Sequence, residues 1–166
     1  PVGDADRGTL ARECVVCQPA AFIRREVFER IGGLDERLEA CFDYDLWMRI
    51  ARDHVLFRIQ QPLAASRMHP ANKSLGRRET VYREAFEILR RHFDYVPFPW
   101  VYGYASLLVD RRRDQFFQPM AHSGAAFALS LLMGLRCNWK RPTRYIREWL
   151  REFRRGVSRH ARGFAS

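Results

Sequence analysis

The chain has 166 residues, of which 47% are hydrophobic and 29% charged, so it has the size of one domain and enough apolar material to exclude a disordered protein. Its net charge of +10 lies entirely in the second half, because residues 1–76 carry 11 basic and 11 acidic side chains whereas residues 77–166 carry 18 and 8. The longest uncharged run, residues 115–135, contains an apolar stretch only about half as long as the ~20 residues that a membrane-spanning helix needs.

In chain order, the first elements alternate between extended and helical patterns. Residues 15–24 are rich in β-branched and apolar side chains and predict two short extended pieces broken at Gln18 and Pro19. A short helix is expected at 25–31, ended by Gly32 and Gly33, and a longer amphipathic helix at 43–53. Residues 55–59 and 63–68 then predict two strands.

From residue 77 onward only helices are expected. Their predicted ranges are 77–93, 102–110, 121–135 and a last helix that starts at Pro142 and places arginines opposite an apolar face. We therefore predict an α/β fold in two parts, residues 1–95 and a helical, basic extension over residues 96–166.

The four cysteines include one C-x-x-C pair, Cys14 and Cys17, which lacks a second pair at zinc-finger spacing. We interpret these two as buried apolar residues in a reduced, cytoplasmic protein.

Asp43 and Asp45 open the helix predicted at 43–53. A carboxylate at a helix amino end is stabilised in its ionised form, which suits a general base but also an ordinary helix cap. His69 follows a predicted strand and is either a metal ligand or a structural histidine. From the residues alone, the structural interpretation is favoured for both.

Four stretches in order resemble the acceptor-side half of the family 2 glycosyltransferases, inverting enzymes of the GT-A fold. They are QPAAFIRREVF at 18–28, IGGLDERL at 31–38, DYDLWMR at 43–49 and AASRMHPANKS at 64–74. The resemblance implies a partial GT-A, Rossmann-like fold and a hexosyltransferase-type activity in bacterial cell-envelope polysaccharide synthesis.

Carried over by position, the resemblance makes Asp43 the catalytic base, although Phe42 stands before it where many members have Glu. It gives Asp45, Trp47 and Arg49 roles in orienting the acceptor or seating the helix. It places His69 at the metal or diphosphate, with Arg67 and Lys73 as candidates on the phosphate side.

The resemblance further implies a divalent cation, Mg²⁺ or Mn²⁺, a nucleotide-sugar donor and a saccharide or lipid-linked acceptor. The sequence departs from the family in one respect: the family's nucleotide-binding half, with its Asp-x-Asp motif, is not found in it.

The second hypothesis is a non-catalytic, basic module that binds membrane surfaces. Residues 136–166 combine ten basic side chains with Trp and Phe at helical spacing, which suits peripheral contact with the inner face of the plasma membrane. Nucleic acid is not expected as a partner, because the basic residues form no known binding motif and the first half of the chain is neutral.

Overall fold

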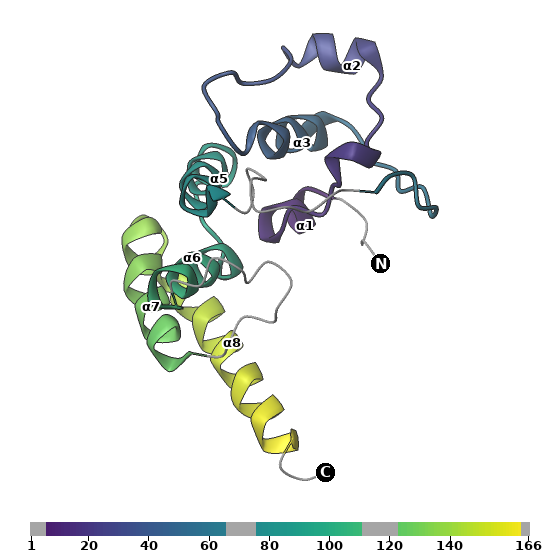
Figure 1. Ribbon diagram of the computed structural model, residues 1–166. Helices are drawn as coiled ribbons and strands as arrows, with labels where there is room; N and C mark the ends of the chain where they lie inside the picture. The colour runs from purple at the N-terminus through teal and green to yellow at the C-terminus, as the bar shows by residue number, and fades with distance from the viewer. Residues whose placement is uncertain (1–5, 66–75, 111–122, 164–166) are drawn as a thin grey trace.

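The computed structural model describes residues 6–65, 76–110 and 123–163, and within these ranges the chain is helical (Figure 1). It forms seven α-helices and one 3₁₀ turn over the described residues. The helices are α1 (Arg7–Arg12), α2 (Arg25–Arg30), α3 (Phe42–Asp53), α5 (Arg78–Phe93), α6 (Phe98–Asp110), α7 (Gly124–Cys137) and α8 (Pro142–Gly163), and the 3₁₀ turn spans Gln18–Ala20.

The predicted α/β class, and with it the partial GT-A fold, is wrong. The stretch predicted as two extended pieces has extended backbone at Cys17 and Ala21, but the 3₁₀ turn at Pro19 interrupts it. Neither this stretch nor residues 55–59 and 63–65 forms a β-ladder with any other described segment. A β-strand needs a neighbour to complete its backbone hydrogen bonds, and no described segment provides one.

The helices follow the predicted pattern closely. Those expected at 25–31, 43–53 and 77–93 are confirmed within one residue at each end. Gly32 and Gly33 follow α2 and have φ values of 80° and 70°, a conformation that favours glycine. The helices expected at 102–110 and 121–135 are confirmed with shifted ends, and α8 starts at Pro142 as predicted. Helix α1 was not predicted.

The core lies where α1, α3, α5 and α6 meet, and it continues into α7 and α8. Helix α3 contributes Tyr44, Leu46, Trp47, Met48 and Ile50, which are all buried. Tyr95 and Val96, in the link between α5 and α6, are also buried, so one apolar cluster includes residues on both sides of the boundary predicted at residue 95. The division into two parts stays a prediction.

Candidate functional site

The amino end of α3 is held by a buried carboxylate from α5. The side chain of the cap residue, Cys41, makes no capping hydrogen bond there. Instead, Glu84 accepts hydrogen bonds from the backbone N–H groups of Glu39, Ala40 and Cys41, at 2.8, 2.9 and 2.8 Å. A carboxylate suits this position because the amino end of a helix attracts negative charge. Glu84 therefore fixes the start of α3, and with it Asp43, relative to α5.

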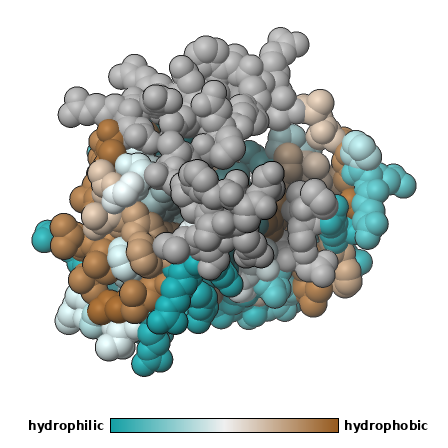
Figure 2. Space-filling model, turned by 90° about the horizontal axis from the view of Figure 1, so that it is seen from below, coloured by the Kyte–Doolittle hydropathy of each residue, from teal (hydrophilic) through white to brown (hydrophobic). Residues whose placement is uncertain are grey.

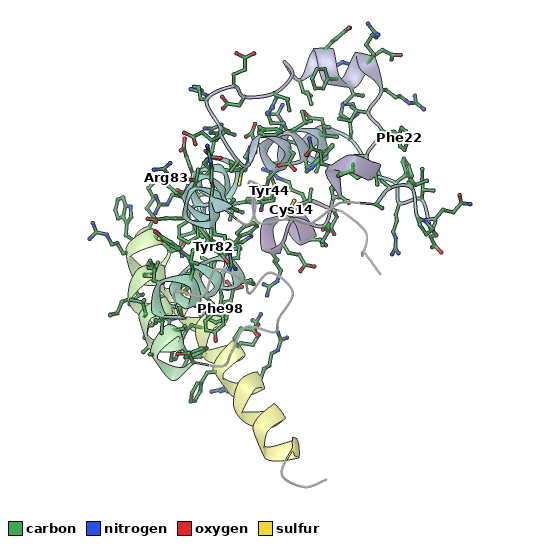
Figure 3. The ribbon with its side chains drawn as sticks, in the orientation of Figure 1. Cys14, Phe22, Tyr44, Tyr82, Arg83 and Phe98 are labelled. Atoms are coloured by element: carbon green, nitrogen blue, oxygen red, sulfur yellow. The ribbon has the colours of Figure 1, made fainter. Side chains whose placement is uncertain are left out.

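Asp43 lies in the first turn of α3 and lines a pocket of about 440 Å³. The pocket lies between α1, α3, α5 and the start of α6, where Figure 3 shows Cys14, Tyr44 and Tyr82 gathered. Its lining residues are Arg12, Glu13, Cys14, Ala40, Cys41, Asp43, Tyr44, Arg78, Val81, Tyr82, Pro99 and Trp100. It combines an aromatic wall with a few charged groups, as small-molecule sites do.

The environment of Asp43 makes it a stronger base than an ordinary aspartate. Burial raises the pKa of its carboxyl group above the usual 3.8, and the hydrogen bond from the Tyr44 backbone N–H, at 2.8 Å, only partly offsets this effect. A raised pKa brings a carboxylate nearer to the range in which general bases work best. Asp43 can therefore accept a proton from a group bound in the pocket.

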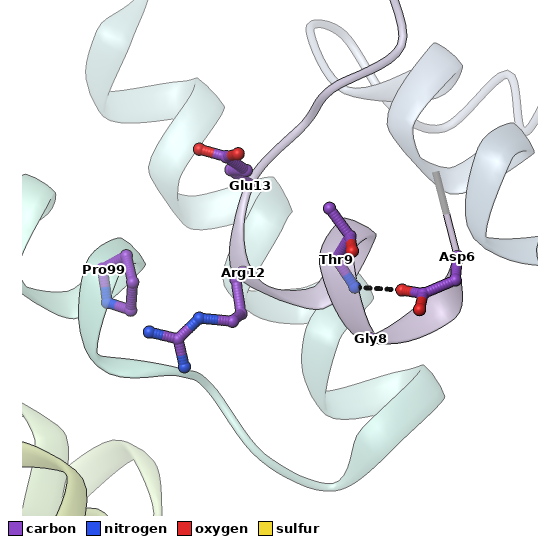
Figure 4. A pocket seen from close by; sticks show the side chains of 6 residues that line it. All are labelled: Asp6, Gly8, Thr9, Arg12, Glu13 and Pro99. Atoms are coloured by element: carbon purple, nitrogen blue, oxygen red, sulfur yellow. Dashed lines mark hydrogen bonds between the residues drawn. The ribbon is translucent and has the colours of Figure 1, made fainter. Parts of the chain in front are cut away.

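A second hollow of about 620 Å³ lies beside this pocket (Figure 4). The two share Arg12, Glu13 and Pro99, and the second adds Asp6, Gly8 and Thr9 of α1 and its cap. Arg12 extends toward Pro99 in Figure 4 and forms an ion pair with Glu148 of α8 at 2.8 Å. The three shared lining residues make the two hollows neighbours.

Asp45, two residues after Asp43, lies in a different environment. It is only 1% exposed, and its carboxylate accepts a hydrogen bond from Arg49 at 2.7 Å. His92 and Arg91 of α5 lie within 3.4 and 3.5 Å of its other oxygen. Burial alone would raise the pKa of Asp45, but the hydrogen bonds from His92 and Arg49 outweigh it and lower the pKa.

The remaining candidates on α3 also lie inside the protein. Arg49 donates to the backbone oxygens of Ile31 and Gly33, at 2.6 and 2.7 Å, and so ties the turn after α2 to α3. Trp47 is buried in the core, and its indole N–H has no hydrogen-bond partner among the described residues. The structure thus separates Asp43, which faces a pocket, from Asp45, Trp47 and Arg49, which pack the helix. Their roles toward an acceptor stay predictions.

Three sequence candidates, Arg67, His69 and Lys73, lie outside the described residues. Over the ranges that the structure does describe, no three His, Cys, Asp or Glu side chains come together as metal ligands would. The expected Mg²⁺ or Mn²⁺ therefore rests on the resemblance.

Sequence reasoning missed Glu84 and the aromatic wall formed by Tyr82 and Trp100. A signal for Glu84 was present, because this acidic residue falls on the apolar side of α5 between Val81 and Ile88. The cysteine interpretation was wrong: Cys14 and Cys17 are exposed, and Cys41 is the buried one. Cys17 has extended backbone but pairs with no described strand, so no sheet covers it.

Comparison with known proteins supports a relation to glycosyltransferases. Part of the chain is 27% identical over 77 residues to an uncharacterized glycosyltransferase of Haemophilus influenzae, a match that covers 45% of this chain and 26% of that protein. The chain thus matches about a quarter of the relative's length. No known family profile matches the chain, and no solved structure does. The similarity is partial, and it does not establish family 2 membership.

Proposed function

We propose that the chain is the acceptor-side part of a glycosyltransferase in which Asp43 accepts a proton from the attacking hydroxyl group. The observation that carries the proposal is the position of Asp43, in the first turn of a helix anchored by Glu84, facing a pocket and holding a raised pKa. The partial similarity to a glycosyltransferase supports the same reaction class.

In the proposed reaction, a hydroxyl group of a saccharide or lipid-linked acceptor loses its proton to the Asp43 carboxylate. The acceptor oxygen bonds to the anomeric carbon of a nucleotide sugar, and the bond from that carbon to the diphosphate breaks, which inverts the configuration and releases the nucleoside diphosphate. General base catalysis of this kind contributes about 10²–10⁴-fold to the rate.

The pocket beside Asp43 suits the acceptor side of this reaction. Tyr82 and Trp100 offer apolar ring surface, whereas Arg12, Glu13 and Asp43 offer partners for hydroxyl groups. The matched stretch is about a quarter of the relative's length, so we place the binding site for the nucleotide in another part of the whole protein. A divalent cation at the diphosphate is part of this proposal.

The test compares two aspartates on the same helix. A strain of the source organism that lacks the whole protein is complemented with the wild type, with Asp43→Asn or with Asp53→Asn. Transfer of labelled sugar from a panel of UDP- and GDP-sugars to its cell-envelope fraction is then measured. Asp53 is the matched control, because it ends α3 on the surface, where it pairs with the neighbouring Arg52 at 2.9 Å.

The proposal predicts that Asp43→Asn lowers transfer at least about 100-fold and that Asp53→Asn leaves it unchanged. Near-normal transfer by a folded Asp43→Asn protein would refute Asp43 as the base.

A further inference from the structure

Helix α8 uses only part of its apolar surface to pack against the protein. Tyr145 is fully buried and donates a hydrogen bond to the Ser130 backbone oxygen at 2.9 Å. The Trp149 ring packs on Phe127 with centroids 4.3 Å apart, and its indole N–H donates to the Phe127 backbone oxygen. This face fastens α8 to α7.

The two acidic residues of α8 belong to the packed side. Glu148 is buried and accepts hydrogen bonds from Tyr95 and Arg12, at 2.6 and 2.8 Å. Glu152 is paired with Arg155 at 2.8 Å and lies 3.9 Å from Arg12. Because these carboxylates are turned toward the protein or neutralised, the outer faces of α8 carry positive charge over its described side chains, residues 142–156.

Next to the packed face lies a partly exposed apolar stripe, whose Phe153 also contacts the rings of Phe127 and Trp149 with centroids 5.7 and 5.8 Å apart. Ile146, Leu150 and Phe153 are 37%, 41% and 48% exposed. They are spaced at i, i+4 and i+7, so they align along one side of the helix.

A row of arginines runs parallel to this stripe. Arg147, Arg151 and Arg154 each follow a member of the stripe by one residue and are all exposed. One residue corresponds to a turn of about 100°, so the arginine row lies beside the apolar stripe, on the side away from the packed face. Beyond α7 the helix extends free of the other helices (Figure 1), and the molecule seen from below shows hydrophobic and hydrophilic residues side by side on its surface (Figure 2).

We propose that α8 binds the surface of an anionic phospholipid bilayer. The apolar stripe enters the boundary between headgroups and acyl chains, and the arginine row contacts lipid phosphates, to which a guanidinium can donate two hydrogen bonds. Charge complementarity favours an anionic lipid surface, because the flank of the stripe is cationic and no carboxylate among the described side chains of α8 is unpaired. The stripe is also too narrow for a large protein interface. None of the described helices is long and apolar enough to cross a membrane, so the contact is peripheral.

The experiment measures partition of the purified chain onto phosphatidylcholine vesicles that contain increasing fractions of phosphatidylglycerol, without any sugar substrate. The proposal predicts that binding rises with the anionic fraction and falls with salt. Reversing two charges with Arg147→Glu and Arg151→Glu lowers partition at least about tenfold. Removing the apolar contact with Ile146→Ser and Leu150→Ser has an effect of similar size.

The matched control reverses two exposed charges elsewhere, with Arg24→Glu and Arg25→Glu at the start of α2, far from α8 in Figure 1. It changes the net charge equally and alters partition by no more than about twofold, because screening confines the effect of a charge to its surroundings. Far-UV circular dichroism checks that each variant is folded.

Three results would overturn the proposal. They are equal binding to neutral and anionic vesicles, equal loss of binding in the α2 control, and self-association of the free chain that the Ile146→Ser and Leu150→Ser variant abolishes. The last result would assign the stripe to a second copy of the chain. Because the assay contains no sugar substrate, its outcome is independent of the proposed transferase activity.

Discussion

The two faces of α3 place an aspartate side chain in opposite electrostatic environments. On one face, Asp45 is 1% exposed and lies beside Arg49, Arg91 and His92, so two guanidinium groups match its charge. On the other face, Asp43 meets a pocket, and its carboxylate accepts a hydrogen bond from the Tyr44 backbone N–H. The pKa of Asp45 is lowered and that of Asp43 is raised.

This contrast separates a carboxylate that holds the fold from the one that we propose as the base. A carboxylate paired with cations in the core gains stability from its charge, whereas one buried without a cation costs stability and gains basicity. The following variants test whether the two faces differ as described.

The largest effect is expected at Asp45. Asp45→Asn removes a buried negative charge and leaves the guanidinium groups of Arg49 and Arg91 without their carboxylate partner. Breaking a buried pair in this way costs about 3–5 kcal/mol of unfolding free energy. Urea unfolding of the purified chain at neutral pH measures it. If the loss of unfolding free energy is smaller than that from breaking a solvent-exposed ion pair, the cluster around Asp45 is solvated.

The stability difference between the wild type and Asp45→Asn should depend on pH. Because the folded pKa of Asp45 is below its usual 3.8, its stabilising effect is present above that value and is lost as the pH falls through the lower, folded value. The wild type should therefore approach the variant in stability at acid pH, and a constant difference would contradict the assignment.

A smaller loss of unfolding free energy is expected at Glu84, which holds the amino end of α3. Glu84→Gln replaces an acceptor of three backbone hydrogen bonds by an amide with one oxygen, and it should cost about 1–3 kcal/mol. The control is Glu87→Gln on the same helix, where an exposed pair with Arg91 contributes less than about 1 kcal/mol. Equal losses in urea unfolding would mean that Glu84 does not anchor α3.

The smallest effect on stability, and of opposite sign, is expected at Asp43. Since its folded pKa is raised, the ionised group lowers stability as the pH rises through the interval between the usual and the folded pKa, and this cost persists at neutral pH. Asp43→Asn should therefore unfold at a slightly higher temperature than the wild type at pH 7, with no such gain below the usual pKa. A clear loss of thermal stability would assign Asp43 a structural role instead.

The helices could be predicted from the sequence because their pattern is local. The apolar spacing of Leu46, Trp47 and Ile50 marks α3, and Gly32 with Gly33 marks the end of α2. The strands could not, because a strand depends on a partner distant in sequence. Phe22 and Phe57 illustrate the difference: they lie in stretches with β-like composition, but the structure leaves them 82% and 89% exposed.

The candidate site was predictable only at its centre. Asp43 is visible in the sequence as an acid in a first helical turn. The pocket around it also needs Arg12 from the unpredicted α1, and Tyr82 and Trp100 from two later helices. These residues meet only through tertiary packing, which no local pattern records.

The most direct test of the account is the pH dependence of sugar transfer by the whole protein. If Asp43 is the base, the rate falls on the acid side with the titration of one group, at a pH above the ordinary aspartate value of 3.8, and this fall is absent from the residual activity of Asp43→Asn. A rate that stays constant down to pH 3.8, or an unchanged acid limb in Asp43→Asn, would contradict the account.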